Sequence, residues 1–317
     1  MANTDLISGG LSATRATLGA VAGDFVPGSR SDDPLAERDT EFIRRTLPAY
    51  SALADLYFRP KVRGLEHVPA EGPVLLVGNH SGGTLIADTF AFSYGFYKHF
   101  GPDRLFHQLA HDLVFKVPGL VTLPKYGTVP ASHENAEAAL GKGAAVLVYP
   151  GGDYETYRPS WHGSEIEFGG RSGFVRLALA NEVPIVPVVA IGGQETALFM
   201  TRGERLSRAL RLDRLLRLKV LPIQVAPPFG LTVLDLPGRI PLPSQITIQV
   251  LPPLDVREIF GQDPDAEDVS GAITALMQDA LDELAAERDL PVVGTVGERM
   301  EESEIADDVA RRLEQVS

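Results

Sequence analysis

Three short apolar runs constrain the fold of this chain more than any other feature. They are PVLLVGN at 73–79, AAVLVYP at 144–150 and PIVPVVAIGG at 184–193. Each is rich in β-branched residues and too short to cross a membrane, which is typical of strands buried on both faces of a sheet. Segments with helical spacing accompany them at 84–100, 132–140, 172–180 and 268–288. This alternation predicts an α/β fold with a largely parallel central sheet flanked by helices.

Weaker patterns add further elements. Strands are expected at 61–68, 104–110 and 246–253. Residues 37–58 have apolar side chains at roughly helical spacing, and we expect Pro48 to kink or split that helix. Two interpretations of this helix stay open: it packs on the main domain, or it rests on a bilayer.

These patterns divide the chain into four expected parts. A flexible N-terminal arm occupies residues 1–36, and the N-terminal helical segment follows at 37–58. The α/β domain spans residues 59–290, and a charged C-terminal tail occupies residues 291–317.

The composition excludes several kinds of protein. The chain has 317 residues and no cysteine, which rules out disulfides, thiolate zinc sites and cysteine nucleophiles. Its net charge of −13 argues against a general nucleic-acid binder, which needs a basic face. No run of about 18 apolar residues occurs that could span a membrane. The first residues lack the basic start and apolar block of a signal peptide, so none is expected.

The segment GPVLLVGNHSGGTLIADTF, residues 72–90, holds the first candidate site. His80 follows the apolar strand and precedes a helix that we expect to begin with Thr84 as its N-cap. Sheets of this kind bind ligands at the carboxyl ends of their strands. A histidine there can act as a general base, and Asp88 could orient it if the glycine loop folds back. The alternative is a polar linker histidine and an aspartate favoured by the helix dipole.

Two later segments carry further candidates. VLVYPGGDYETYRP, residues 146–159, ends a strand at Gly151 and Gly152, whose backbone could approach a ligand closely, and continues to Glu155. Glu155 could bind a substrate hydroxyl or contact the histidine. Arg171 precedes a helix and could hold an anionic or carbonyl group. The alternatives are a simple turn that ends a strand and a surface arginine.

Taken together, these segments resemble the lysophospholipid acyltransferase superfamily, and most of all its branch of diacylglycerol acyltransferases and related neutral-lipid ester synthases. The resemblance covers roughly residues 60–255. It is carried by Asn79-His80 with Asp88, by Tyr149-Pro150-Gly151-Gly152 with Glu155, by Arg171–Phe174 with Val183–Val188, and by GTVPASHENAEAAL at 127–140.

The chain departs from the superfamily pattern in two places. The superfamily usually has four residues between its histidine and aspartate, whereas seven separate His80 from Asp88, and Leu85 stands at the usual aspartate position. The second block of the glycerol-3-phosphate enzymes carries a phosphate-binding arginine, and residues 127–133 contain none. Either the acceptor lacks a glycerol phosphate head, or Arg171 holds it instead.

The resemblance implies a reaction in lipid metabolism, such as phospholipid biosynthesis. An acyl thioester on coenzyme A or an acyl carrier protein serves as co-substrate, and a lipid hydroxyl of a lysophospholipid, a diacylglycerol or a similar molecule accepts the acyl group. His80 takes the hydroxyl proton, Asp88 orients the imidazole, and Asn79, Gly151, Gly152, Glu155 and Arg171 bind substrate. No metal or other cofactor is implied. The expected location is the cytoplasm, peripheral on the inner face of a membrane.

The same residues suggest three alternative functions. A serine esterase or lipid hydrolase is suggested by Ser81, although the G-x-S-x-G motif is absent there. A nucleotide-binding oxidoreductase is suggested by the glycine-rich turn, but no acidic ribose partner is evident. A non-enzymatic lipid-binding protein is the third alternative.

Residues 202–219 are the candidate membrane contact. This segment has seven basic and two acidic residues within a chain of net charge −13, and leucines are interleaved with its arginines. Each basic residue near an anionic lipid surface contributes about 1 kcal/mol of binding. A solvated helix is the alternative.

Overall fold

The computed structural model describes residues 33–112, 114–116, 120–211, 220–235 and 238–288. The expectations for the N-terminal arm up to residue 32, for the tail at 291–317 and for residues 212–219 of the basic segment lie outside these described residues.

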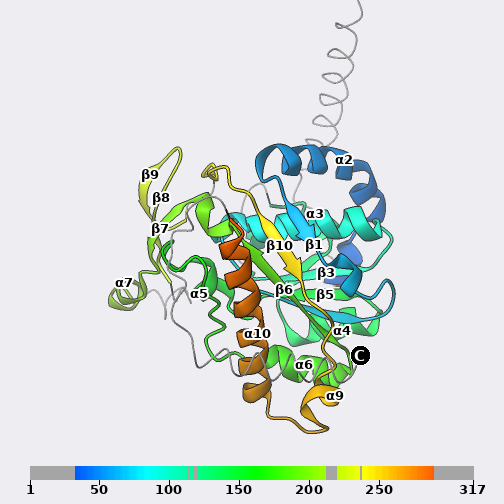
Figure 1. Ribbon diagram of the computed structural model, residues 1–317. Helices are drawn as coiled ribbons and strands as arrows, with labels where there is room; N and C mark the ends of the chain where they lie inside the picture. The colour runs from blue at the N-terminus through cyan, green and yellow to red at the C-terminus, as the bar shows by residue number, and fades with distance from the viewer. Residues whose placement is uncertain (1–32, 113, 117–119, 212–219, 236–237, 289–317) are drawn as a thin grey trace, which may run out of the picture.

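A seven-stranded sheet forms the centre of the molecule (Figure 1). Its strand order is β1 (Lys61–Arg63), β10 (Thr247–Val250), β6 (Ile185–Ile191), β2 (Val74–Gly78), β5 (Ala145–Val148), β3 (Phe106–Ala110) and β4 (Thr128–Pro130). The strands from β6 to β4 are parallel to their neighbours, whereas β10 is antiparallel to β6 and β1 runs parallel to β10. The predicted α/β fold with a largely parallel sheet is confirmed.

Helices cover both faces of this sheet. They are α2 (Thr40–Tyr57), α3 (Ala87–Phe100), α4 (His133–Gly141), α5 (Gly152–Thr156), α6 (Gly173–Asn181), α7 (Glu204–Ala209), α9 (Val256–Phe260) and α10 (Ala266–Ala286). Short 3-10 turns join them at η1 (Pro34–Glu37), η2 (Leu65–His67), η3 (Gly83–Leu85), η4 (Val114–Lys116), η5 (Leu123–Tyr126) and η6 (Gly193–Thr196).

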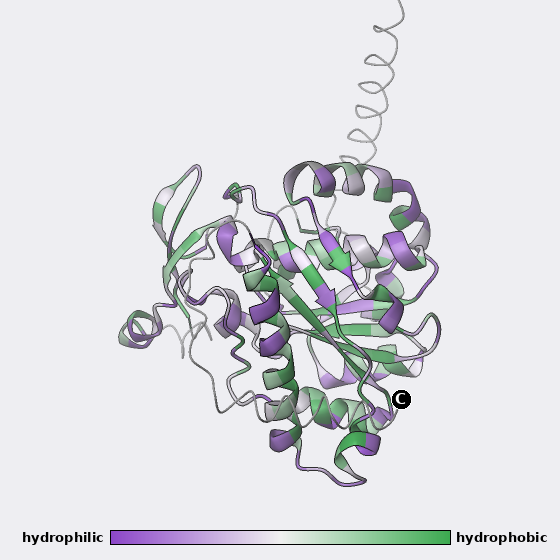
Figure 2. Ribbon diagram, viewed as in Figure 1, coloured by the Kyte–Doolittle hydropathy of each residue, from purple (hydrophilic) through white to green (hydrophobic). Residues whose placement is uncertain are grey.

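Apolar residues on both faces of the central strands make two cores. Leu75 and Val77 of β2 join the cluster under α4, α6 and α10, whereas Val74 and Leu76 join the cluster under α3. All four are fully buried. Burying such a side chain contributes about 1.5–3 kcal/mol, and the central strands are hydrophobic almost throughout (Figure 2). A continuous apolar run is therefore read correctly as a strand covered on both sides.

Helix α2 packs on the domain. Asp39 caps it by accepting the Phe42 N–H at 2.9 Å, and Ile43 is fully buried in the core shared with α3. The helix continues through Pro48, so of the expected kink or split the split is wrong and the kink stays a prediction. Of the two interpretations left open by the sequence, the structure places this helix against the α/β domain.

Helix α3 begins at Ala87, so the predicted start with Thr84 as N-cap is wrong. Gly82 and Gly83 have φ values of 90° and 65°, which are left-handed conformations that glycine adopts without strain. The N–H and hydroxyl groups of Thr84 bond to other parts of the chain rather than to the first turn of α3. The loop therefore closes into η3 before the α-helix starts.

The predicted strand at 61–68 is shorter than expected. It ends at Arg63, because Gly64 turns with φ of 76° and a side chain there would lie 2.2 Å from the Val250 carbonyl oxygen. The strand expected at 246–253 is likewise confined to β10.

A second, three-stranded antiparallel sheet was not predicted. It consists of β7 (Leu198–Thr201), β8 (Ile223–Ala226) and β9 (Gly230–Val233) and lies to one side of the central sheet (Figure 1). Its strands are only four residues long, which is too short for a clear alternating pattern. Among the described residues, no helix has the length and hydrophobicity needed to cross a membrane.

Candidate active site

His80 lies at the carboxyl end of β2, and its ring contacts Asp88 of α3. Nδ1 is 3.0 Å from Asp88 Oδ2, and the side chains are 12% and 1% exposed. Because a carboxylate only accepts hydrogen bonds, Nδ1 carries the proton and Nε2 is left as the basic nitrogen. The structure thus brings together the two residues for which the sequence proposed catalytic roles.

The glycine loop makes this contact possible despite the seven intervening residues. Asp88 lies in the first turn of α3, and its Oδ2 also accepts the Ser81 N–H at 2.7 Å. Its Oδ1 accepts the Thr89 N–H at 2.7 Å. The carboxylate therefore links the first turn of α3 to the Ser81 backbone. The three extra residues are taken up by η3.

The Tyr149 ring stacks on the imidazole. The ring centroids of His80 and Tyr149 are 4.2 Å apart and the planes are inclined by 16°. Gly78 makes room for this ring, because a side chain at that position would approach it to 2.6 Å. Thr89 donates a hydrogen bond to the Tyr149 hydroxyl at 2.9 Å, and burial raises the pKa of that phenol well above its ordinary value. Tyr149 is thus a neutral platform for the imidazole.

Asn79 joins two strands of the sheet. Its amide nitrogen donates to the Ala190 carbonyl at 2.9 Å, and its amide oxygen accepts the Ala190 N–H at 2.7 Å. The side chain is fully buried. Its polar atoms extend the pairing of β2 with β6, so the structure places Asn79 beneath the histidine as a support.

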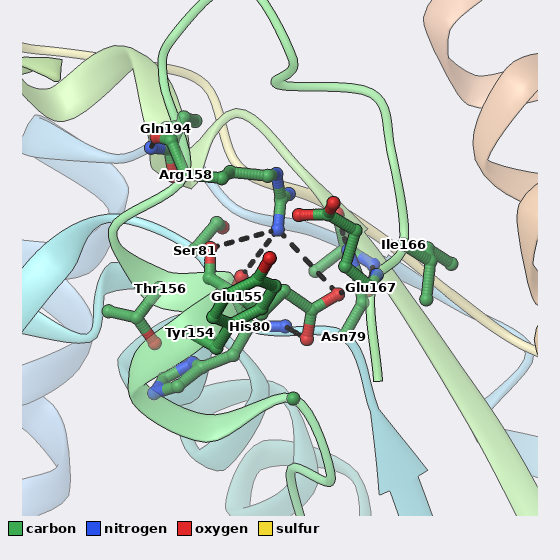
Figure 3. Close-up of polar contacts among 12 residues, drawn as sticks. Asn79, His80, Ser81, Tyr154, Glu155, Thr156, Arg158, Ile166, Glu167 and Gln194 are labelled. Atoms are coloured by element: carbon green, nitrogen blue, oxygen red, sulfur yellow. Dashed lines mark hydrogen bonds and ion pairs between the residues drawn. The ribbon is translucent and has the colours of Figure 1, made fainter. Parts of the chain in front are cut away.

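Glu155 reaches the backbone of His80, not its imidazole. Its Oε2 accepts the His80 N–H at 2.9 Å, and the carboxyl group is fully buried. Arg158 is also fully buried; it donates to the His80 carbonyl at 2.9 Å and lies 3.6 Å from Glu155 Oε1. In Figure 3 the Arg158 guanidinium lies between the His80 backbone and Glu155. These two side chains bond both backbone polar groups of the candidate base.

The Pro-Gly-Gly turn is shaped by the same carboxyl group. A side chain at Gly151 would lie 2.4 Å from Glu155 Oε2, so only glycine fits there. Arg171 donates to the carbonyl groups of Pro150 and Gly151, each at 2.7 Å, and approaches Asp153 at 3.6 Å. Arg171 is 44% exposed, but its guanidinium closes this turn.

Ser81 points away from the histidine. It is 1% exposed, and its Oγ is 3.4 Å from Asp88 Oδ2. A side chain added at Gly193 would lie 2.2 Å from this Oγ, so the space around the hydroxyl is filled by backbone. The geometry of a serine nucleophile activated by His80 is absent.

The loop after Ser81 is held by the second sheet and its connections. Arg239 donates to the Gly82 carbonyl at 2.5 Å, and Asp235 accepts the Thr84 N–H at 2.6 Å. The two side chains form a buried ion pair at 2.7 Å. The Gly82 N–H bonds to Gln194 at 3.2 Å. The N–H groups of Gly82 and Thr84 are therefore already bonded within the protein.

In the described part of the chain, no group of three or more histidine, aspartate or glutamate side chains is placed to hold a metal ion.

A family model described as Acyltransferase matches residues 59–191. This part of the chain resembles the acyltransferase family. It contains the strands from β1 to β6 and with them His80, Asp88 and Glu155.

Several relatives resemble the acyltransferase segment. An uncharacterized protein of Mycobacterium tuberculosis is 28% identical over 226 residues, which cover 71% of this chain and 60% of the relative. The human "DGAT1/2-independent enzyme synthesizing storage lipids" is 30% identical over 40% of this chain and 38% of its own length. Phytyl ester synthase 2 of Arabidopsis thaliana is 34% identical over 41% of this chain and 19% of its own length. The chain thus spans at most about 60% of these relatives.

One solved structure has the same fold. The 1-acyl-sn-glycerophosphate acyltransferase PlsC of Thermotoga maritima superposes with a TM-score of 0.50 at 16% identity. The match covers 80% of this chain and 86% of that protein.

Sequence reasoning about the candidate site missed Arg158 and Tyr149 as functional residues. The Glu155-x-x-Arg158 spacing places opposite charges close together in a short helical turn, and this was the available signal. The contact of Tyr149 with His80 joins the ends of two adjacent strands, and the sequence does not state which strands are adjacent.

The stability of the domain is expected to fall as Glu155 ionises. Desolvation raises the pKa of Glu155 to about 7 from an ordinary value of 4.5, although Arg158 opposes the shift. Between these two pKa values, Glu155 loses its proton in the unfolded state but keeps it in the folded state. The stability that protonated Glu155 contributes is therefore present at low pH and is lost as the pH rises. Relative to Glu155→Gln, the wild type should lose up to about 1.4 kcal/mol of unfolding free energy per pH unit. Urea unfolding at pH 4.5, 6 and 7 would measure this difference, and a constant difference would contradict the expectation.

Proposed function

We propose that the chain transfers a fatty acyl group from a thioester, on coenzyme A or an acyl carrier protein, to a lipid hydroxyl. The observation that carries this proposal is the His80 imidazole, oriented by buried Asp88 at 3.0 Å and partly open to solvent at the end of β2. The match of residues 59–191 to the acyltransferase family supports it. The names of two relatives, a storage-lipid enzyme and a phytyl ester synthase, support a lipid acceptor.

In the proposed reaction, His80 Nε2 accepts the proton of the acceptor hydroxyl as its oxygen attacks the thioester carbonyl carbon. Asp88 stabilises the imidazolium that forms. The carbon–sulfur bond then breaks, and the imidazolium returns the proton to the departing thiolate. The products are an oxygen ester and a free thiol, and His80 is regenerated.

Esterase or lipid hydrolase activity is the competing function. It is disfavoured because Ser81 is buried and bonded to Asp88, so a covalent serine intermediate would need a different arrangement. A lipid-binding protein without activity would not require an imidazole that is held by Asp88 and Tyr149 on a backbone that Glu155 bonds.

The test is a thiol-release assay with acyl-CoA and a panel of lipid acceptors, paired with detection of the acylated lipid. The proposal expects thiol release that depends on an acceptor, with one ester formed for each thiol. Equal release with and without acceptor would indicate a hydrolase. No release with coenzyme A or acyl carrier protein thioesters, combined with lipid binding, would indicate a carrier.

An uncharged lipid hydroxyl is expected to be accepted at least as well as lysophosphatidate. Residues 127–133 hold no arginine, and the Arg171 guanidinium is occupied by the carbonyl groups of Pro150 and Gly151. Initial rates with a diacylglycerol, a long-chain alcohol and lysophosphatidate would measure the preference. A clear preference for lysophosphatidate that Arg171→Ala abolishes would reverse the assignment and make Arg171 the phosphate ligand.

The acceptor chemistry implies work at a lipid surface. We propose peripheral contact with the inner face of a membrane, in the cytoplasm, with residues 202–219 as one contact. Of this segment, Arg205, Arg208 and Arg211 lie in exposed positions among the described residues. Binding of the protein to anionic lipid vesicles would measure this contact. Vesicle binding that is unchanged when these three arginines and Arg214 are replaced by serine would contradict it.

A further inference from the structure

The exposed large apolar side chains gather in one region of the chain. Eleven of the twelve on the described surface are Trp161 or lie between residues 198 and 242, and Leu105 is the exception. The eleven are Trp161, Leu198, Met200, Leu210, Val225, Phe229, Leu231, Val233, Leu234, Ile240 and Leu242. Single exposed apolar residues are ordinary, whereas a contiguous patch marks an interaction surface.

The three-stranded sheet supplies the centre of this patch. Leu198 pairs with Val225, and Val225 pairs with Leu231, so these three form one row across β7, β8 and β9. They are 44%, 37% and 66% exposed. Alternation along β9 places Val233 on the same outer face as Leu231, at 52% exposure. Met200 lies where the pairing of β7 with β8 shifts register and is 42% exposed.

The opposite face of the same sheet covers the active-site loop. Phe199 and Gln224 are buried there, each next to an exposed residue of the row. Gln224 donates to Asp235 at 2.7 Å, and Asp235 bonds to Thr84 of the loop. A side chain at Gly83 would lie 2.9 Å from the Phe199 ring. Thus the apolar outer face is separated from the loop after His80 by the thickness of this one sheet.

Aromatic and basic side chains border the patch. The chain's single tryptophan, Trp161, is 45% exposed, and its neighbour Ser160 donates its N–H to the Phe199 carbonyl of β7 at 2.9 Å. Helix α7 follows β7 after two residues and carries exposed Arg205 and Arg208. The small sheet and α7 project on the same side of the molecule (Figure 1).

We infer that the outer face of β7, β8 and β9 is a docking surface that inserts into a lipid bilayer. This rests on the proposed function, because it would hold the loop beside His80 within the thickness of one sheet of the bilayer that contains the lipid acceptor. Tryptophan favours the interface between lipid and water, and arginine favours anionic headgroups, so the border matches a bilayer in chemistry. The basic border also argues against a symmetric contact with a second copy of this chain, which would place like arginines near one another.

The experiment uses the full chain and vesicles without any acyl thioester, so its result does not depend on catalysis. Trp161 is the only tryptophan and reports insertion by a blue shift of its fluorescence. Vesicles of phosphatidylcholine, with and without phosphatidylglycerol, are the probe. The double variant Leu231→Ser with Val233→Ser should weaken binding to both vesicle types by about tenfold or more, since insertion of two apolar side chains is lost.

Leu105→Ser is the matched control, because Leu105 is exposed at 38% but lies outside the patch. It should bind vesicles like the wild type. Arg205→Ser with Arg208→Ser should weaken binding to the anionic vesicles alone.

Three results would overturn the inference. They are vesicle binding unaffected by the double variant, an unshifted Trp161 spectrum in bound protein, and a wild-type dimer in light scattering that the double variant converts to a monomer without any vesicle binding. Far-UV circular dichroism checks that each variant folds. Vesicle binding by a protein without acyltransferase activity would leave this inference standing and remove the proposed function instead.

Discussion

Replacement of His80 by alanine is expected to lower the turnover number for acyl transfer by at least about 10²–10⁴-fold, the usual contribution of a general base. The imidazole is held by Asp88, stacked on Tyr149 and tied to Glu155 through the backbone, and alanine keeps only the last of these contacts. The variant should remain folded, because the imidazole packs at the rim of the core and not within it. Steady-state thiol release under saturating acceptor would measure the loss.

The substitution Asp88→Asn tests the contribution of the carboxylate separately from that of the His80 base. Asp88 accepts hydrogen bonds from His80, Ser81 and Thr89, whereas an asparagine offers one acceptor oxygen and a donor. Activity should fall if the carboxylate fixes the imidazole tautomer, and melting temperatures should separate this effect from unfolding. Near-normal acyl transfer by a folded His80→Ala protein would contradict the proposed mechanism. Unchanged activity of Asp88→Asn would contradict only the role of Asp88 as the partner of His80.

The substitution Arg158→Met is expected to destabilise the domain by about 3–5 kcal/mol, because it removes the partner of the buried Glu155 carboxyl group and the donor to two backbone carbonyl groups. Arg158 is fully buried, pairs with Glu155 and also donates to the carbonyl groups of His80 and Gly163. Methionine preserves much of the volume but none of these interactions. Urea unfolding at neutral pH, followed by circular dichroism, would measure the change.

Arg257→Met provides the matched control. Arg257 pairs with Glu182 at 2.6 Å, but their side chains are 39% and 72% exposed. Surface pairs of this kind contribute about 0–1 kcal/mol. If Arg158→Met and Arg257→Met lowered the free energy of unfolding by equally small amounts, the buried pair would not stabilise the site. The double variant Glu155→Gln with Arg158→Met should recover part of the lost stability, since no ionisable group is then left unpaired.

The sequence predicted the parts of this molecule whose structure is decided locally. The apolar runs predicted β2, β5 and β6 nearly to the residue, and the helix expected at 132–140 is α4, which Ser132 caps. It failed where distant residues decide the outcome. The helix after His80 starts late because Asp235 and Tyr157, more than 70 residues away in the chain, bond to Thr84.

The same distinction applies to the site. The placement of His80 at a strand end follows from the residues around it, and Asp88 lies close to it in the chain. The loop that brings the two side chains together is nevertheless held by Asp235 and Arg239. The burial of Glu155 and Arg158 depends on how the segment after β5 folds over β2, which no local pattern records. Their supporting role therefore became visible only in three dimensions.

The place of the small sheet in the chain has a further consequence. Strands β6 and β10 are adjacent and antiparallel, and Ile191 pairs directly with Thr247, so the 55 residues between them leave and re-enter the central sheet at a single point. In topological terms this stretch is an insertion into a β-hairpin connection, and such connections tolerate changes of length. It could be exchanged as a cassette while the scaffold that carries His80 stays intact. Because Asp235 and Arg239 belong to the cassette yet hold the catalytic loop, an exchanged cassette would have to bring its own equivalents of both.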